Sequence, residues 1–232
     1  TLGQIIPPSV VLVLLGSVLN ISVGNLFISA LLPGITLVFL YLVYIGIITY
    51  FSSSSAPAMP SEMIKEFKEK TSITNIINAF LLPFILIFAV LGSIFMGIAS
   101  PTEAAGIGAA GALLLSVIQG SINLKKIKDI SSETTKLTSI VFMILLGATS
   151  FSLVFRGLEG DKILVDMITA SNLTPEMFLI SILIVVFIAG FFIDFIEIIF
   201  IIVPVITPIL IALDIDLIWV GIMLAINLQT SF

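Results

Sequence analysis

Long stretches without a single charged residue constrain the fold of this chain more than any other feature. No charged residue precedes Glu62, and the later charge-free runs are 71–102, 104–124, 137–155, 177–193, 198–213 and 217–232. An α-helix needs about 20 mostly apolar residues to cross the ~30 Å hydrocarbon core of a bilayer. The alternating pattern of barrel strands is absent, so the runs predict membrane helices. We therefore expect an all-α integral membrane protein, a multi-span helical bundle.

Composition agrees with this class and excludes several kinds of chemistry. Of 232 residues, 59% are hydrophobic and 10% charged, whereas soluble domains carry about 25% charged residues. With no cysteine and no histidine, disulfides, histidine proton relays and His or Cys metal sites are excluded. An intramembrane serine protease would lack its histidine base, and no G-x-G-D setting for an aspartyl type is present. We expect no enzymatic activity and no cofactor. The net charge of −5 is spread over loops and suggests no nucleic-acid role.

The connecting segments set the expected orientation. Helices are expected at 10–20, 26–50, 76–98, 101–119 and 137–155. Lysines gather in 52–74, whose EMIKEFKEK core is typical of a short amphipathic surface helix, and in 120–136, whereas 156–176 is acidic. The positive-inside rule places the lysine-rich face in the cytoplasm. We therefore expect four spanning helices within 26–155 and an outer-face connecting segment over 156–176.

The region 177–212 allows two topologies. Two apolar arms flank the interruption GFFID, and the next polar stretch, 213–216, is acidic like the segment before 177. One interpretation is two full spans with Asp194 at the inner face. The other is a re-entrant hairpin with 190–194 at its tip, since 13 residues reach roughly 20 Å at 1.5 Å each. The absence of Lys or Arg at the turn favours the hairpin.

The opening TLGQIIPPS predicts a break in a membrane helix. Pro7 and Pro8 donate no backbone hydrogen bond, and residues before proline avoid the helical region. If 10–20 runs to the outer surface, the break lies roughly 15 Å deep, where free backbone groups are tolerated only against protein or a water-filled cavity. Broken helices of secondary transporters hold Na⁺ and anionic substrates in this way. The alternative is a proline kink used for packing. We expect a broken helix over 1–20.

The C-terminal residues repeat this pattern. After Asp216, about ten apolar residues lead roughly 15 Å inward to the polar cluster Asn227, Gln229, Thr230 and Ser231. These side chains offer oxygen ligands of the kind that hard cations prefer. Interhelical hydrogen bonds are the alternative role. We expect 217–232 to be the first half of a second broken helix.

Two carboxylates lie at the tip of the expected hairpin. Asp194 and Glu197 are three residues apart, so they share a face if the segment is helical. Carboxylates inside a membrane are functional candidates by default. Asp194 can also cap the helix that follows it. Both roles stay open.

The stretch GIASPTEAAG has a structural explanation for its lone carboxylate. Ser100 followed three residues later by Glu103 is a capping box, and Pro101 is the favoured first helical residue. The expected position of Glu103 is therefore a helix start at the outer membrane face. The small residues that follow, 104–112, predict close helix packing.

Five ordered motifs resemble the large membrane subunit of tripartite ATP-independent periplasmic (TRAP) transporters. TLGQIIPPS resembles the segment G-T-L-G-x-x-I-P-P-S of that family, and ISVGNLFISALLPG its S-I-G-x-L-F-x-A-x-x-P-G stretch. GIASPTEAAGIGA resembles its G-x-x-T-P-T-E-A-A-x-x-G-A signature, with Ser100 in place of the usual threonine. GFFIDFIEIIFIIVPVITPIL and LDIDLIWVGIMLAINL are similar to its late hairpin and following broken helix. The chain begins and ends in mid-pattern, so we expect a C-terminal half, with the first half of the family's inverted repeat missing.

The resemblance implies a Na⁺-driven permease of the bacterial inner membrane with an elevator movement. It implies import of small organic acids, a periplasmic substrate-binding protein and a small four-helix membrane subunit as partners. By motif matching, the ion and substrate region would include Thr1, Gly3, Pro7, Pro8, Ser9, Gly190, Asp194, Asn227 and Thr230. Another ion-coupled organic-anion transporter, or a channel-like subunit without coupled transport, is the alternative.

Overall fold

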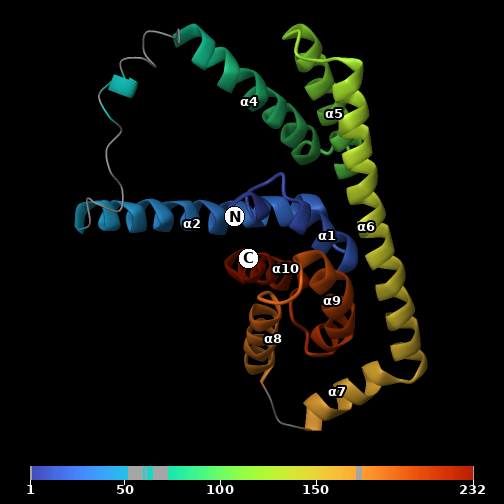
Figure 1. Cartoon of the computed structure of the whole chain (residues 1–232). Helices are drawn as coiled ribbons and strands as arrows, with labels where there is room; N and C mark the ends of the chain where they lie inside the picture. The colour runs from blue at the N-terminus through green and yellow to red at the C-terminus, as the bar shows by residue number, and fades with distance from the viewer. Residues whose placement is uncertain (1, 52–59, 61, 65–72, 171–173, 232) are drawn as a thin grey trace. The chain divides into compact units, whose positions relative to one another are not determined.

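Every regular element of the described chain is a helix. The computed structural model describes residues 2–51, 60, 62–64, 73–170 and 174–231. In order, the elements are η1 (Leu2–Gln4), α1 (Val10–Val18), α2 (Val23–Phe51), α4 (Ile73–Phe95), α5 (Pro101–Ile118), α6 (Leu124–Gly157), α7 (Gly160–Ala170), α8 (Pro175–Ala189), α9 (Phe195–Ala212) and α10 (Leu217–Ser231) (Figure 1). The all-α prediction is confirmed. The amphipathic helix expected within 52–74 lies outside the described residues except for 62–64, which are helical.

Two segments expected to be connections contain helix. Helix α6 begins at Leu124, well before the expected 137. The Asn123 side chain caps it by accepting from the Lys126 N–H at 2.8 Å, and Lys136 pairs with Glu133 one turn away at 3.0 Å. Charged side chains keep this stretch out of the bilayer, but they do not prevent a hydrated helix. The expectation of a loop over 120–136 is therefore wrong from Leu124 onward. Likewise, α7 occupies much of the segment 156–176.

Four helices are long and apolar enough to cross a membrane: Val23–Phe51, Pro101–Ile118, Leu124–Gly157 and Phe195–Ala212. Within the described residues, Phe80–Phe95, Pro175–Ala189 and Leu217–Thr230 are shorter apolar helices. Pro101–Ile118 and Leu124–Gly157 are each only 6% buried within the chain over their apolar windows, whereas Phe195–Ala212 is 39% buried. Helix α8, with 15 residues, rises only about 22 Å, whereas α9 has the 18 residues for about 27 Å.

Internal packing divides the chain into two units. The first comprises Thr1–Leu31 and Asn123–Phe232. Its short helix α1 contacts η1, α9 and α10, while α9 also contacts α6 and α7. Helix α8 makes its main contacts with α10. The largest fully buried side chains are Phe27, Ile5, Leu12, Leu15, Leu26, Ile198, Ile199, Leu210, Leu224, Leu228, Val11 and Val186.

A glycine allows the sharp connection from α1 to α2. A Cβ atom on Gly16 would lie 2.6 Å from Val23 Cγ2, and one on Gly221 would lie 3.0 Å from Leu26 Cδ2. Asn20 completes the turn with a φ of 56°, a left-handed conformation that asparagine tolerates well. The start of α2 therefore packs closely on α1 and α10 within the first unit.

The second unit, Leu32–Ile122, holds the pair α4 and α5, which pack on each other. Gly108 and Gly111 permit the approach, because added Cβ atoms would meet the side chains of Val90 and Leu86. The small-residue packing surface expected over 104–112 is thus confirmed at these two positions. Gly97 ends the α4 region in a left-handed conformation, with a φ of 69°, where glycine is favoured.

Candidate functional site

The break predicted at TLGQIIPPS is present. η1 ends at Gln4 and α1 begins at Val10, and residues 5–8 between them are not helical. Pro7 is buried and Pro8 exposed, and the peptide bond between them is cis. Ser9 caps α1: its Oγ accepts from the Leu12 N–H at 3.3 Å and donates to the Gln4 carbonyl. Ser9 is only 2% exposed, so the hydroxyl that closes the break is buried.

The polar end of α10 lies beside α8. Asn227 Nδ2 donates to the Leu183 carbonyl oxygen at 2.8 Å, and Thr230 Oγ1 donates to the Asn227 carbonyl oxygen at 2.8 Å. Asp216 caps the start of α10 by accepting from the Ile218 N–H at 2.7 Å. Of the two roles considered for Asn227, the structure thus shows an interhelical hydrogen bond.

Gln229 is a buried polar residue that the motif resemblance did not include in the ion and substrate region. It is 2% exposed, and neither atom of its side-chain amide has a hydrogen-bond partner among the described residues. A buried amide without partners costs roughly 1–3 kcal/mol. The Oε1 atom of Gln4 is also buried without a partner within the described part of the chain. From sequence, Gln229 could be grouped with its polar neighbours, but nothing in the pattern showed that it is the buried one.

The two ends of the described chain meet. η1, which carries Gln4, contacts α10, which carries Gln229. The structure therefore places η1, which precedes the break, against α10, which ends in the polar cluster 227–231. Thr1 lies outside the described residues. Gly3 is exposed on η1, and an added Cβ atom there would meet nothing within 4 Å.

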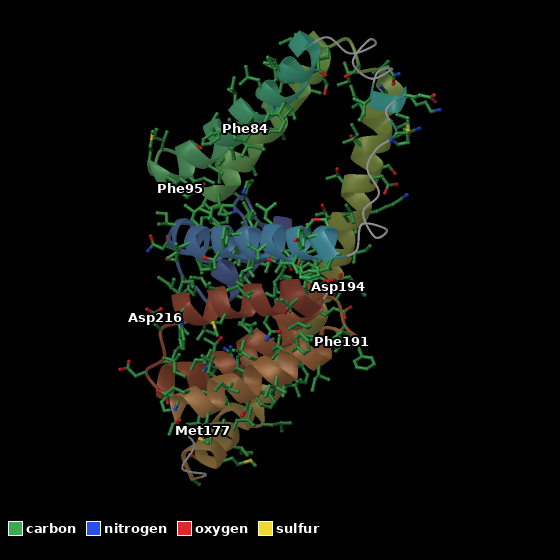
Figure 2. All side chains as sticks on the ribbon, turned by 90° about the vertical axis from the view of Figure 1, so that its left-hand side faces the viewer. Phe84, Phe95, Met177, Phe191, Asp194 and Asp216 are labelled. Atoms are coloured by element: carbon green, nitrogen blue, oxygen red, sulfur yellow. The ribbon has the colours of Figure 1, made fainter. Side chains whose placement is uncertain are left out.

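The tip between α8 and α9 separates two antiparallel arms. Figure 2 shows Met177 and Asp216 at one end of the helices and Phe191 and Asp194 at the other. Helices α8 and α9 thus run in opposite directions. Asn227 on α10 bonds the middle of α8, and both helices start at the same end, so these two run in parallel. The polar end of α10 therefore points toward the tip.

Asp194 caps the returning arm α9. Its Oδ1 accepts from the Phe195 N–H at 2.7 Å, and the carboxylate is exposed. Gly190 is buried and ends α8, and Glu197 lies in the first turn of α9. The capping role of Asp194 is confirmed, and a role toward an ion stays a prediction. Among the described residues, no three His, Cys, Asp or Glu side chains cluster as a metal site would require.

Ser100 and Glu103 form the predicted capping box. The Ser100 N–H donates to Glu103 Oε2 at 2.8 Å, and Ser100 Oγ accepts from the Glu103 N–H at 3.4 Å. The Ser100 hydroxyl also donates to Glu103 Oε2 at 2.7 Å, and Pro101 is the first residue of α5. The lone carboxylate of GIASPTEAAG therefore caps the start of α5.

Comparison with known proteins agrees with these features. The chain is 32% identical over 230 residues to the C4-dicarboxylate TRAP transporter large permease protein of Pseudomonas aeruginosa, covering 99% of this chain and 52% of that protein. It is 28% identical over 229 residues to the sialic acid TRAP transporter large permease protein of Vibrio cholerae, covering 98% of this chain and 52% of that protein. It is 28% identical over 224 residues to the ectoine TRAP transporter large permease protein of Halomonas elongata, covering 96% of this chain and 51% of that protein.

The chain spans about half the length of these curated relatives, as the missing half of the motif pattern suggested. All three relatives are transporter permeases rather than enzymes, which supports the expectation of no enzymatic activity. The family described as "Tripartite ATP-independent periplasmic transporter, DctM component" matches residues 1–232. With a match over its whole length, the chain belongs to the DctM family of TRAP transporter permeases.

Proposed function

We propose that the chain is half of the permease of a Na⁺-driven transporter that imports small organic acids. The names of the relatives support this substrate class, because C4-dicarboxylates, sialic acid and ectoine all carry a carboxylate. The substrate and the coupling ion are proposed for the full-length permease, because this chain spans about half the length of its relatives. An inner-membrane location follows from the family and from the apolar helices.

One observation carries the proposal: η1 and α1, on either side of the break, contact α10, and Gln229 on α10 is buried without a hydrogen-bond partner among the described residues. Neutral oxygens of amides and carbonyls are suitable ligands for a hard cation. Gln229, Gln4 and the backbone of residues 5–8 would supply such oxygens, with Ser9 holding the break in shape. Asn227 and Asp194 then position their helices, and Thr230 closes the last turn of α10.

Coupling would need the site to open to each side of the membrane in turn. In the proposed elevator movement, α8, α9 and α10 travel with the broken segment, and 177–212 enters and leaves the membrane on the outer side. The 15 residues of α8 support the hairpin, because about 22 Å falls short of the ~30 Å core. The length of α9 also permits the two-span alternative.

Import would also require partners. We propose a periplasmic substrate-binding protein that delivers the organic acid and a small four-helix membrane subunit beside the permease. The family match and the names of the relatives as TRAP transporter permeases support both partners.

The test is uptake by proteoliposomes that contain the full-length permease with both partners. Succinate, sialic acid and ectoine are offered separately, with and without the binding protein and with Na⁺ or K⁺ outside. The proposal expects uptake of one carboxylate class that needs both Na⁺ and the binding protein. Equal flux of all three compounds in K⁺ would instead support the channel-like alternative. Coupling to a different ion would support the other transporter alternative.

A further inference from the structure

A groove on the first unit lies between the end of α1, the last turns of α6, α7 and α9. Two cavities of about 320 and 460 Å³ form it, and both are lined by Val18, Arg156 and Pro204. Volumes of roughly 300–1,000 Å³ with mostly apolar walls and few polar groups are typical of ligand sites. None of its lining residues belongs to the region around Gln4, Ser9 and Gln229.

The groove has the depth of one bilayer leaflet. Its wall on α6 runs from Arg156 to Leu145, which is roughly 16 Å at 1.5 Å per residue. The apolar core of a bilayer is ~30 Å thick, so one leaflet measures about half of that. Arg156 lies at the end of α6 opposite the lysines of 124–136, at the edge of the apolar span. The floor is apolar, with buried Ala148 and Phe200.

The mouth of the groove carries one charge of each sign. Arg156, the only arginine of the chain, lines both cavities, and Asp161 on α7 lines the second. In the described part of the chain these two side chains form no ion pair with each other, whereas Lys162 pairs with Glu159 at 2.9 Å. The guanidinium fork suits a phosphate, and the carboxylate suits an ammonium group. Hydroxyls of Ser17, Thr149 and Ser152 lie along the same walls.

We propose that this groove binds a single zwitterionic glycerophospholipid of the phosphatidylethanolamine class. The phosphate binds Arg156, the ammonium group binds Asp161, and an acyl chain follows α6 toward Leu145. A lipid with an anionic headgroup and no amine would match Arg156 but face the Asp161 carboxylate. The occupant would contact the last turn of α1, the helix that follows the break. This site is independent of the proposed ion coupling, and its test does not use transport.

The experiment measures lipid retained by the full-length permease purified with its membrane partner. The complex is washed with detergent, and bound phospholipid is identified and counted by mass spectrometry. We expect one tightly held phosphatidylethanolamine in the wild type. Arg156→Gln should reduce retention by about tenfold or more, because a charge-assisted bond to phosphate is lost. Asp161→Asn should shift the preference toward phosphatidylglycerol.

Lys162→Gln is the matched control, because Lys162 is a neighbouring cation that does not line the groove. It should retain lipid as the wild type does. Equal retention in all four proteins would mean annular lipid only and would overturn the proposal. A second measurement uses Ser152→Cys, since the chain has no cysteine. If this thiol is protected from a maleimide even after lipid extraction, another protein segment fills the groove, and the proposal is wrong.

Discussion

Replacing Gln229 by methionine separates a ligand from a packing residue. The side chain is 2% exposed, and its amide has no partner among the described residues. Methionine has a similar shape and no polar group. Without Na⁺ or substrate, Gln229→Met should raise the free energy of unfolding by about 1–3 kcal/mol, because the desolvated amide is removed. With a saturating concentration of Na⁺, the wild type should become more stable than the Gln229→Met variant.

The reversal follows from linkage. A ligand that binds only the folded protein stabilises it by about 4.1 kcal/mol at 1,000 times its Kd, which exceeds the roughly 1–3 kcal/mol gained by removing the amide. If the Gln229 oxygen binds Na⁺, the wild type gains this stabilisation in Na⁺ and the variant loses most of it. The wild type should therefore be the less stable protein in K⁺ and the more stable one in Na⁺.

The assay is thermal unfolding of the purified full-length complex in K⁺ and in increasing Na⁺. Gln119→Met is the control, because Gln119 is exposed at the end of α5 and its replacement should change neither curve. A Gln229→Met protein with an unchanged Na⁺-dependent shift would remove Gln229 from the ion site. A variant less stable than the wild type in K⁺ would show that another segment of the whole protein satisfies the amide.

Four further substitutions, at three residues, test individual polar side chains. Asn227→Ala should lower the free energy of unfolding by about 0.6 to 1.7 kcal/mol, the average and the maximum for interhelical hydrogen bonds in membranes. No change in thermal unfolding would mean that the bond to Leu183 contributes nothing. Asp194→Asn should leave the complex assembled and, if the carboxylate faces the ion, weaken the Na⁺ dependence of uptake; unchanged Na⁺ dependence would leave capping as its whole role. Glu103→Gln should keep most uptake, since glutamine also serves in capping boxes, whereas Glu103→Ala should lower the unfolding temperature, because the hydrogen bond from the Ser100 N–H is lost. Loss of uptake by a correctly inserted Glu103→Gln protein would contradict the structural role of Glu103.

Local signals in the sequence were enough to predict the capping box at Ser100 and the helix break before Ser9. Both features depend only on residues a few positions apart: Ser100 pairs with Glu103, and Pro7 and Pro8 break the helix before Ser9. Such local features can be predicted from the sequence alone. The start of α6 could not be predicted from the charge-free runs. A charge-free run shows which residues can lie inside a bilayer, but it does not show where a helix begins. Leu124–Lys136 is polar yet helical, since its caps and ion pairs are satisfied in water.

The candidate site could be predicted only in part, because burial is a tertiary property. The four polar residues after Ile226 are equivalent in a sequence pattern. Packing of α10 against α8 and η1 turns Asn227 toward a backbone carbonyl and encloses Gln229. The groove at Arg156 arises from α1, from the consecutive helices α6 and α7, and from α9, so no single motif could indicate it.

Uptake driven by an imposed Na⁺ gradient tests the central claim most directly. Proteoliposomes with the full-length permease, its membrane partner and the binding protein receive an inward Na⁺ gradient, and accumulation of the preferred carboxylate is followed over time. We expect accumulation above the outside concentration that collapses when an ionophore dissipates the gradient. Accumulation that persists after the Na⁺ gradient is collapsed, or mere equilibration in its presence, would contradict Na⁺-coupled transport.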